Sequence, residues 1–181
     1  SEKDMEYKMT IAGVERELEM FEVNEHLDIA AFILFNDVEI TEKSAEALLK
    51  ICPEHDVVLT AEAKSISLAY EFARIGCRKF IVARKGLKVY MKNPVSVSVK
   101  SITTANEQML HLGETEVNAI KGKRVLIVDD VISTGESLIA VQKLVAEAGA
   151  VEAAACAVLA EGDAAKRDDI IFLNPLPLFF K

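Results

Sequence analysis

Apolar residues occur in short runs along this chain, separated by segments of helical periodicity or by polar stretches. The runs are rich in β-branched residues and have the length of buried strands. Six of them are predicted as strands: residues 28–35, 56–61, 80–83, 125–128, 151–159 and 170–173.

Three of the intervening segments place apolar residues three or four positions apart, which predicts amphipathic helices. The first is expected to begin at the N-cap Thr41 and to end at Pro53. The second ends near Gly76 and the third at Gly149. Strands that alternate with helices predict an α/β fold, with a mostly parallel central sheet and helices on both faces. Ligands in such sheets bind beyond the carboxyl ends of the strands.

Two segments depart from this alternation. Residues 1–27 are rich in charge and predict a small N-terminal appendage, or hood, outside the main sheet. Residues 85–112 begin as a polar stretch, and Val95, Val97 and Val99 then alternate with polar residues. With residues 109–112 as a partner, this alternation predicts a β-ribbon. We expect both segments to belong to a single domain of residues 1–181.

Composition and charge exclude several classes of protein. The net charge of −8 argues against nucleic acid as a partner. The longest apolar runs are too short to span a bilayer, and no basic-then-apolar leader opens the sequence, so we expect a cytoplasmic protein without a membrane partner. The three cysteines lie far apart in the sequence and are expected to be reduced core residues. The three histidines are not spaced like the ligands of a metal ion, so a structural metal site is not expected.

Residues 125–137 carry the most informative chemistry. A buried strand is followed by the carboxylates of Asp129 and Asp130, then by a turn of hydroxyl-bearing residues and glycine that leads into a helix. Free amides at a helix N-terminus bind phosphate, and carboxylates accept hydrogen bonds from hydroxyls or bind a cation. This combination predicts a site for a phosphorylated sugar.

The run resembles the phosphoribosyl pyrophosphate (PRPP) signature of the type I phosphoribosyltransferases. The resemblance implies that Asp129 and Asp130 bind the ribose hydroxyls and that the following turn wraps the 5′-phosphate. The implied phosphate cradle consists of Ser133, Thr134, Gly135, Glu136 and Ser137. Many adenine-type members have a second glycine where this chain has Glu136, so only the backbone is expected to face the phosphate there.

Two other interpretations of the acid pair were weighed. Receiver domains of response regulators also carry paired acids at a strand end, but they need about 100 residues after the pair, in line with ordinary domain sizes. Only 51 residues follow Asp130 in this chain. An ordinary strand-to-helix connection with solvated acids is the second interpretation, which the flanking strand and helix do not exclude.

A basic segment offers a place for pyrophosphate. Nine basic residues and one acid lie between Lys64 and Lys100. The turn Glu62, Ala63, Lys64 and Ser65 resembles the Glu-Ala-Arg-Gly turn of adenine phosphoribosyltransferases, with lysine in place of arginine and serine in place of glycine. An Arg-Lys pair that contacts pyrophosphate in the family matches Arg84 and Lys85. A capped helix and a solvated basic turn are the ordinary alternatives.

The resemblance also implies a mechanism. Asp129, Asp130, Arg84 and Lys85 become the catalytic residues, and Mg²⁺ is expected near the two acids, mostly through substrate and water. Residues 87–108 have the length of a mobile lid, from which Lys88 reaches the phosphates when the lid closes. Adenine-type enzymes carry a glutamate near the position of Thr103, and this chain has none there.

Recognition of the base is the least determined part of the site. Phe35, Asn36 and Asp37 are candidates because related enzymes place a hood near the end of the first strand, although core packing explains Phe35 equally well. The C-terminal Leu-Pro-Leu-Phe-Phe run lines either this pocket or a dimer interface.

The function implied by the resemblance is that of a purine phosphoribosyltransferase, a pentosyltransferase of purine salvage. Adenine is the expected base, with xanthine or hypoxanthine and guanine as alternatives. A regulator that senses PRPP without turnover is a further alternative, although 27 residues before the sheet are too few for a DNA-binding domain. The expected partners are PRPP, a purine and, in a homodimer, a second copy of the chain.

Overall fold

A five-stranded parallel sheet forms the centre of the computed structural model, which describes residues 5–99 and 107–181. Its strand order is β10-β9-β8-β4-β5, and every neighbouring pair in it is parallel. The strands are β4 (Val57–Ala61), β5 (Phe80–Ala83), β8 (Arg124–Ile132), β9 (Val151–Glu161) and β10 (Ile171–Leu176). All five were predicted from the apolar runs.

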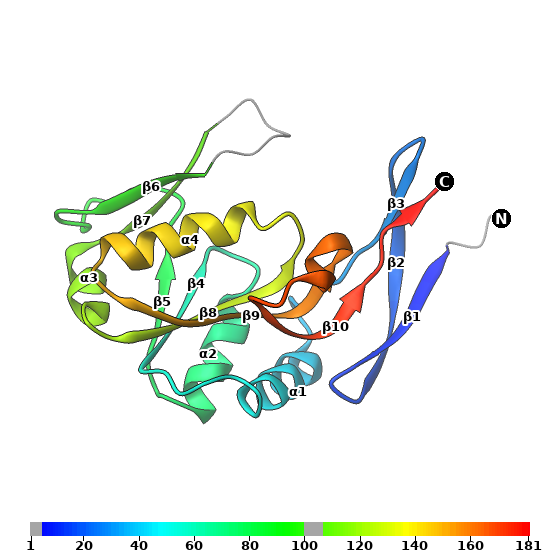
Figure 1. Ribbon diagram of the computed structural model, residues 1–181, viewed down its shortest axis with the longest axis horizontal. Coiled ribbons are helices and arrows are strands. Elements are labelled where there is room, and N and C mark those ends of the chain that lie inside the picture. Colours follow the sequence, from blue (N-terminus) through cyan, green and yellow to red (C-terminus); the bar gives the residue numbers. More distant parts are fainter. Residues whose placement is uncertain (1–4, 100–106) are drawn as a thin grey trace.

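Helices cover both faces of this sheet, as predicted (Figure 1). The helices α1 (Val38–Leu49) and α2 (Ile66–Ile75) pack on one face, where Val58 and Leu126 join their core. The helix α4 (Glu136–Glu147) packs on the other face, against Leu59 and Ile127. The alternation of side chains along each strand therefore feeds two separate cores. The short helix α3 (Glu114–Ile120) and the 3₁₀ helix η1 (Gly162–Lys166) were not predicted.

The two ends of the chain form a second, antiparallel sheet beside the main body (Figure 1), which we call the hood sheet. It contains β1 (Glu6–Ile11), β2 (Val14–Asn24), β3 (Leu27–Ala30) and β11 (Phe179–Phe180) in that order. The predicted appendage is thus present. The strand predicted over residues 28–35 is wrong in extent and place: only its first residues are extended, and they pair antiparallel in the hood sheet.

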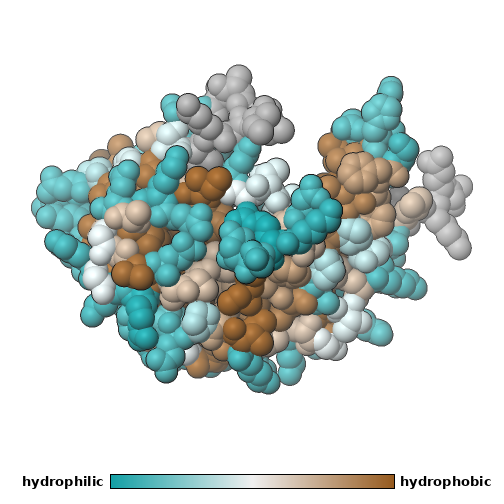
Figure 2. Space-filling view, in the orientation of Figure 1, coloured by the Kyte–Doolittle hydropathy of each residue, from teal (hydrophilic) through white to brown (hydrophobic). Residues whose placement is uncertain are grey.

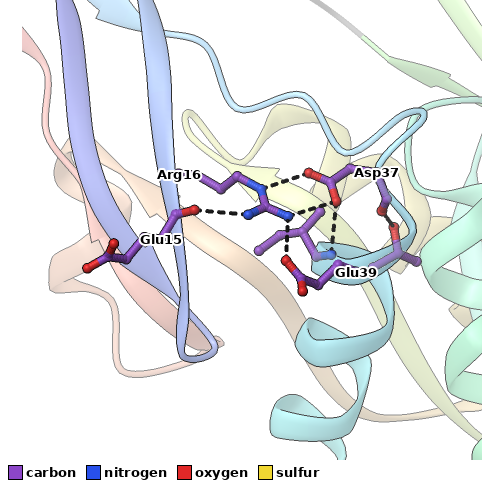
Figure 3. Close-up of polar contacts among 6 residues, drawn as sticks. Glu15, Arg16, Asp37 and Glu39 are labelled. Atoms are coloured by element: carbon purple, nitrogen blue, oxygen red, sulfur yellow. Dashed lines mark hydrogen bonds and ion pairs between the residues drawn. The ribbon is translucent and has the colours of Figure 1, made fainter.

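The predicted start of the first helix also needs correction. Asp37, not Thr41, is the N-cap of α1, since its carboxylate accepts a hydrogen bond from the amide of Ile40 at 3.1 Å. Thr41 lies inside the first turn and donates to the carbonyl of Asp37 at 2.7 Å. Arg16 of β2 holds the same carboxylate with two donors and also contacts Glu39 (Figure 3). This cluster ties the hood sheet to α1.

The predicted ribbon is present as the antiparallel pair β6 (Val95–Val99) and β7 (Gln108–Leu112). It joins the main sheet where Arg84, just after β5, pairs with His111 through two backbone hydrogen bonds of 2.8 and 2.9 Å. Thr103 and the rest of the segment compared with the adenine-type glutamate run lie outside the described residues. Within the part of the chain that is described, no helix is long and apolar enough to cross a membrane.

Candidate active site

A cavity of about 410 Å³ lies at the carboxyl ends of β4 and β8. The surface is hollowed between the hood sheet and the rest of the molecule (Figure 2). The cavity is lined by parts of four predicted motifs: the acid pair, the cradle, the turn after β4 and the Arg-Lys pair after β5. The lining includes Asp129, Asp130, Thr134, Gly135, Ser137, Ala63, Lys64, Ser65 and Lys85.

The acid pair lies within β8, which continues to Ile132 instead of ending before the acids as predicted. Asp130 is 2% exposed, and its carboxylate accepts from the amide of Val131 at 2.8 Å. Asp129 is partly exposed, and its carboxylate accepts from the hydroxyl of Ser65 at 2.9 Å. The same hydroxyl accepts from the amide of Asp130 at 2.8 Å. Ser65, predicted to contact pyrophosphate, thus ties the turn after β4 to the acid pair.

The carboxyl group of Asp129 does not titrate as an ordinary surface acid. Burial raises the pKa of Asp129 to about 7, and the hydrogen bond and charge of Asp130 add to this shift. The Ser65 hydroxyl and the Asp130 amide oppose it by stabilising the charged form. Asp129 therefore changes charge near neutral pH, and its ionised form is an acceptor for ligand hydroxyls.

The cradle forms the opposite wall of the cavity at the N-terminus of α4. Gly135, the N-cap of α4, has a φ of +84°, a left-handed conformation that favours glycine. Gly135 has no side chain to cap the helix, and the hydroxyl of Thr134 accepts from the amide of Glu136 only at 3.4 Å, so other amides of the first turn remain available for an anion. Ser133 and Glu136 belong to the same turn but do not line the cavity.

The predicted pyrophosphate residues divide into two groups. Lys64 and Lys85 line the cavity, whereas Arg84 and Lys88 do not. Arg84 is ion-paired with Glu62 and donates to the hydroxyl of Tyr90 at 3.0 Å. The hydrogen bond from Arg84 is the main reason why the pKa of the Glu62 carboxyl is lowered. The guanidinium of Arg84 is therefore engaged beside the cavity.

The predicted base-pocket residues lie away from this cavity. Asp37 is occupied as the cap of α1 and as the partner of Arg16, which lowers the pKa of its carboxyl (Figure 3). Phe35 is 44% exposed, and Asn36 has a left-handed φ of +68°. None of the three lines the cavity, and their role in base binding stays a prediction.

Several lining residues had not been picked out from the sequence. Gln108 and Leu110 come from β7 and Cys156 from β9, whereas Glu62 already belonged to the predicted turn. Gln108 could have been noticed from the sequence, because it is a polar residue at the first position of a largely apolar strand. Leu110 and Cys156 could not have been recognised as site residues, because their sequence surroundings are those of ordinary core residues.

Among the described residues, no cluster brings together three or more histidine, cysteine, aspartate or glutamate side chains that could bind a metal ion. Asp129 and Asp130 supply the hard oxygen ligands that Mg²⁺ prefers. Two carboxylates fit a cation that completes its shell with substrate oxygens and water.

Comparison with known proteins settles the family. Residues 36–175 match the phosphoribosyl transferase domain, a segment that contains the acid pair, the cradle and both basic turns. The chain belongs to the phosphoribosyltransferase family.

Individual phosphoribosyltransferases are similar over much of this chain. A hypoxanthine/guanine phosphoribosyltransferase of Methanococcus voltae is 32% identical over 131 residues, which cover 72% of this chain and 66% of the relative. An adenine phosphoribosyltransferase of Nocardia farcinica is 31% identical over 126 residues, with coverages of 70% and 64%. The chain thus matches slightly less than two thirds of each of these relatives.

A solved structure of a phosphoribosyltransferase has the same fold. The adenine phosphoribosyltransferase of Saccharomyces cerevisiae, solved with adenine and an imino-altritol bisphosphate, superposes with a TM-score of 0.69. The match covers 86% of this chain and 93% of that one at 20% sequence identity. The fold of this chain is therefore the type I phosphoribosyltransferase fold.

Proposed function

We propose that this protein transfers the 5-phosphoribosyl group of PRPP to a purine base, releasing pyrophosphate and a nucleoside monophosphate. One observation carries the proposal: a single cavity is lined by an acid pair, by a helix N-terminus whose N-cap is a glycine, and by two lysines. These are complementary to ribose hydroxyls, to a 5′-phosphate and to pyrophosphate, respectively.

In the proposed reaction, the residues of the chain bind and orient the substrate. The carboxylates of Asp129 and Asp130 accept from the ribose hydroxyls, and the amides of the cradle bind the 5′-phosphate. A ring nitrogen of the base bonds to C1′ while the bond from C1′ to the pyrophosphate oxygen breaks, its electron pair leaving with pyrophosphate, and the proton of that ring nitrogen is released to water. Lys64 and Lys85 stabilise the charge that develops on the leaving pyrophosphate. No side chain acts as a nucleophile.

The proposal includes Mg²⁺ held near Asp129 and Asp130, largely through substrate and water. When bound, the cation supplies positive charge to the pyrophosphate oxygens. Arg84 is included as a second source of charge. Its guanidinium is free to serve pyrophosphate only once the contact with Glu62 is given up.

The identity of the purine is the finer part of the proposal. The turn after β4 favours adenine because it resembles the corresponding turn of adenine phosphoribosyltransferases. Hypoxanthine or guanine is the second candidate, supported by the 32% identical relative of that name. Xanthine is included in the assay as a third. A homodimer and a cytoplasmic location accompany the proposal as predictions from the sequence.

The deciding experiment offers PRPP and Mg²⁺ with adenine, hypoxanthine, guanine or xanthine in turn and measures released pyrophosphate. Release with one or more bases supports the transferase and identifies its substrate. Binding of PRPP in calorimetry without release on any base supports a PRPP-sensing regulator instead. Failure to bind PRPP contradicts both. Light scattering on the same samples tests the dimer.

A further inference from the structure

The basic side chain of Arg167 lies directly against the backbone of the cradle at Gly135. A Cβ atom built on Gly135 would lie 2.5 Å from Nη1 of Arg167, so the guanidinium already occupies the space beside this glycine. Arg167 comes from the end of η1, far from the cradle in sequence. Nothing in its local sequence marked it as a site residue.

The guanidinium of Arg167 is held in one orientation. Its Nε and Nη2 donate to the two carboxylate oxygens of Asp169, each at 2.8 Å. This two-pronged contact uses one edge of the guanidinium, and the remaining nitrogen, Nη1, is the atom beside Gly135. Among the described residues, Nη1 has no hydrogen-bond partner. The guanidinium of Arg167 thus lies beside the cradle, and its Nη1 is available to donate a hydrogen bond to a ligand.

The cradle segment itself carries no positive side chain that could neutralise a bound phosphate. Residues 131–141 contain no lysine or arginine, and Glu136 adds a negative charge to the first turn of α4. The two lysines of the cavity belong to the turns after β4 and β5, where pyrophosphate is proposed to bind. The 5′-phosphate would otherwise depend on amides and hydroxyls alone.

We propose that Arg167 is a binding residue for the 5′-phosphate and supplies the side-chain charge that the cradle itself lacks. The inference rests on the proposed function and adds to it a specific contact. Gly135 has a second role here: a side chain at this position would push the guanidinium away from the cradle.

The test compares Arg167→Gln with Lys166→Gln, in which an exposed neighbouring cation is removed. Calorimetry with ribose 5-phosphate measures affinity for each protein. Loss of a charge-assisted hydrogen bond predicts a dissociation constant about tenfold to a hundredfold higher for Arg167→Gln and unchanged for Lys166→Gln. Arg167→Lys, which keeps the charge, restores part of the affinity.

A pH series separates binding from a purely structural role. A phosphate monoester gains its second charge near pH 6, so a direct contact predicts a larger loss at pH 7.5 than at pH 5. An equal loss at both pH values, or wild-type affinity in Arg167→Gln, overturns the inference. If the wild-type protein binds ribose 5-phosphate and Arg167→Gln is unimpaired, only the inference falls. If the wild-type protein binds neither ribose 5-phosphate nor PRPP, the proposed function falls with it.

Discussion

Asp129 has two properties that act against each other. Its place beside Ser65 and Asp130 presents an acceptor to the cavity, yet burial raises its pKa to about 7. A carboxyl that must ionise in a partly dry site costs stability, which is a common exchange at functional sites. Ser65 offsets some of this cost by donating to the charged form.

The acid pair itself is tested by replacing both of its members. We expect Asp129→Asn with Asp130→Asn to lower kcat/KM for PRPP by at least about a hundredfold, because two charge-assisted acceptors for the ribose are lost. Circular dichroism should show that the fold is retained. Asp168→Asn, which removes an exposed acid, is the matched control. Unchanged turnover in the double variant would contradict the role of the pair.

Stability should depend on pH through the same carboxyl. Because the folded pKa of Asp129 lies above the ordinary value of 3.8, the folded state holds the proton more tightly than the unfolded state. The stabilising contribution of the protonated form is complete below pH 3.8 and is lost as pH rises through about 7.

We therefore expect Asp129→Asn to be more stable than wild type at pH 8, with the difference disappearing near pH 4. Each kcal/mol recovered corresponds to a Tm increase of about 2–4 °C for a protein of this size. Scanning calorimetry of both proteins at several pH values measures the difference in Tm. A variant less stable than wild type at pH 8 would show that the carboxylate gains more from Ser65 than it loses by burial.

At the scale of single elements, Arg16 and Asp37 connect β2 to the start of α1. Both side chains are 28% exposed, and two hydrogen bonds of 2.9 and 3.0 Å join them (Figure 3). Asp37 also caps the helix, so its removal breaks two kinds of contact whereas removal of Arg16 breaks one. The two substitutions should differ accordingly.

We expect Arg16→Ala to lower the free energy of unfolding by about 0.5–1 kcal/mol and Asp37→Ala by about 1–3 kcal/mol. Urea titration measures both. Arg16 lowers the pKa of Asp37, so the ion pair contributes above the ordinary pKa of 3.8 and is lost as pH falls below it. The effect of Arg16→Ala should therefore shrink at pH 3. Equal effects of the two substitutions would argue against the cap.

The same helix explains why some elements were predicted from sequence and others were not. The spacing of Ala45 and Leu48 is a local property of the buried face and located α1 correctly. The choice of Asp37 over Thr41 as N-cap depends on Arg16, which lies 21 residues away in sequence. Aspartate and threonine are both common N-cap residues, with aspartate somewhat preferred, and the contact with Arg16 adds a tertiary preference for Asp37.

The candidate site divides in the same way. Asp129, Gly135 and Lys64 were found because one continuous motif or turn contains each of them. Arg167 was not, since its nearness to Gly135 arises only when η1 folds back beside the cradle. Arg84 was placed at the correct strand end, but its pairing with Glu62 depends on side-chain geometry that spacing does not reveal.

At the scale of the whole molecule, the hood sheet depends on both ends of the chain. β11 pairs with β3, and Lys181 reaches Asp28 at 2.8 Å and Glu22 at 3.0 Å. The ring of Phe179 packs on the ring of Tyr7 in β1 with centroids 5.2 Å apart. No pattern within residues 1–27 predicts this dependence, because the fourth strand lies more than 150 residues away.

Removal of residues 179–181 should therefore loosen the hood sheet and leave the main sheet intact. One aromatic contact is worth about 0.5–1.5 kcal/mol, and the lost strand exposes the backbone of β3 as a new edge. In hydrogen exchange, we expect faster exchange in β3 than in the intact chain and unchanged protection in β8, which lies in the interior of the main sheet. Lys181→Ala, which keeps β11, should have a smaller effect. Uniformly faster exchange, with β8 affected as much as β3, would mean that the two sheets unfold as one unit and would contradict the independence of the hood sheet.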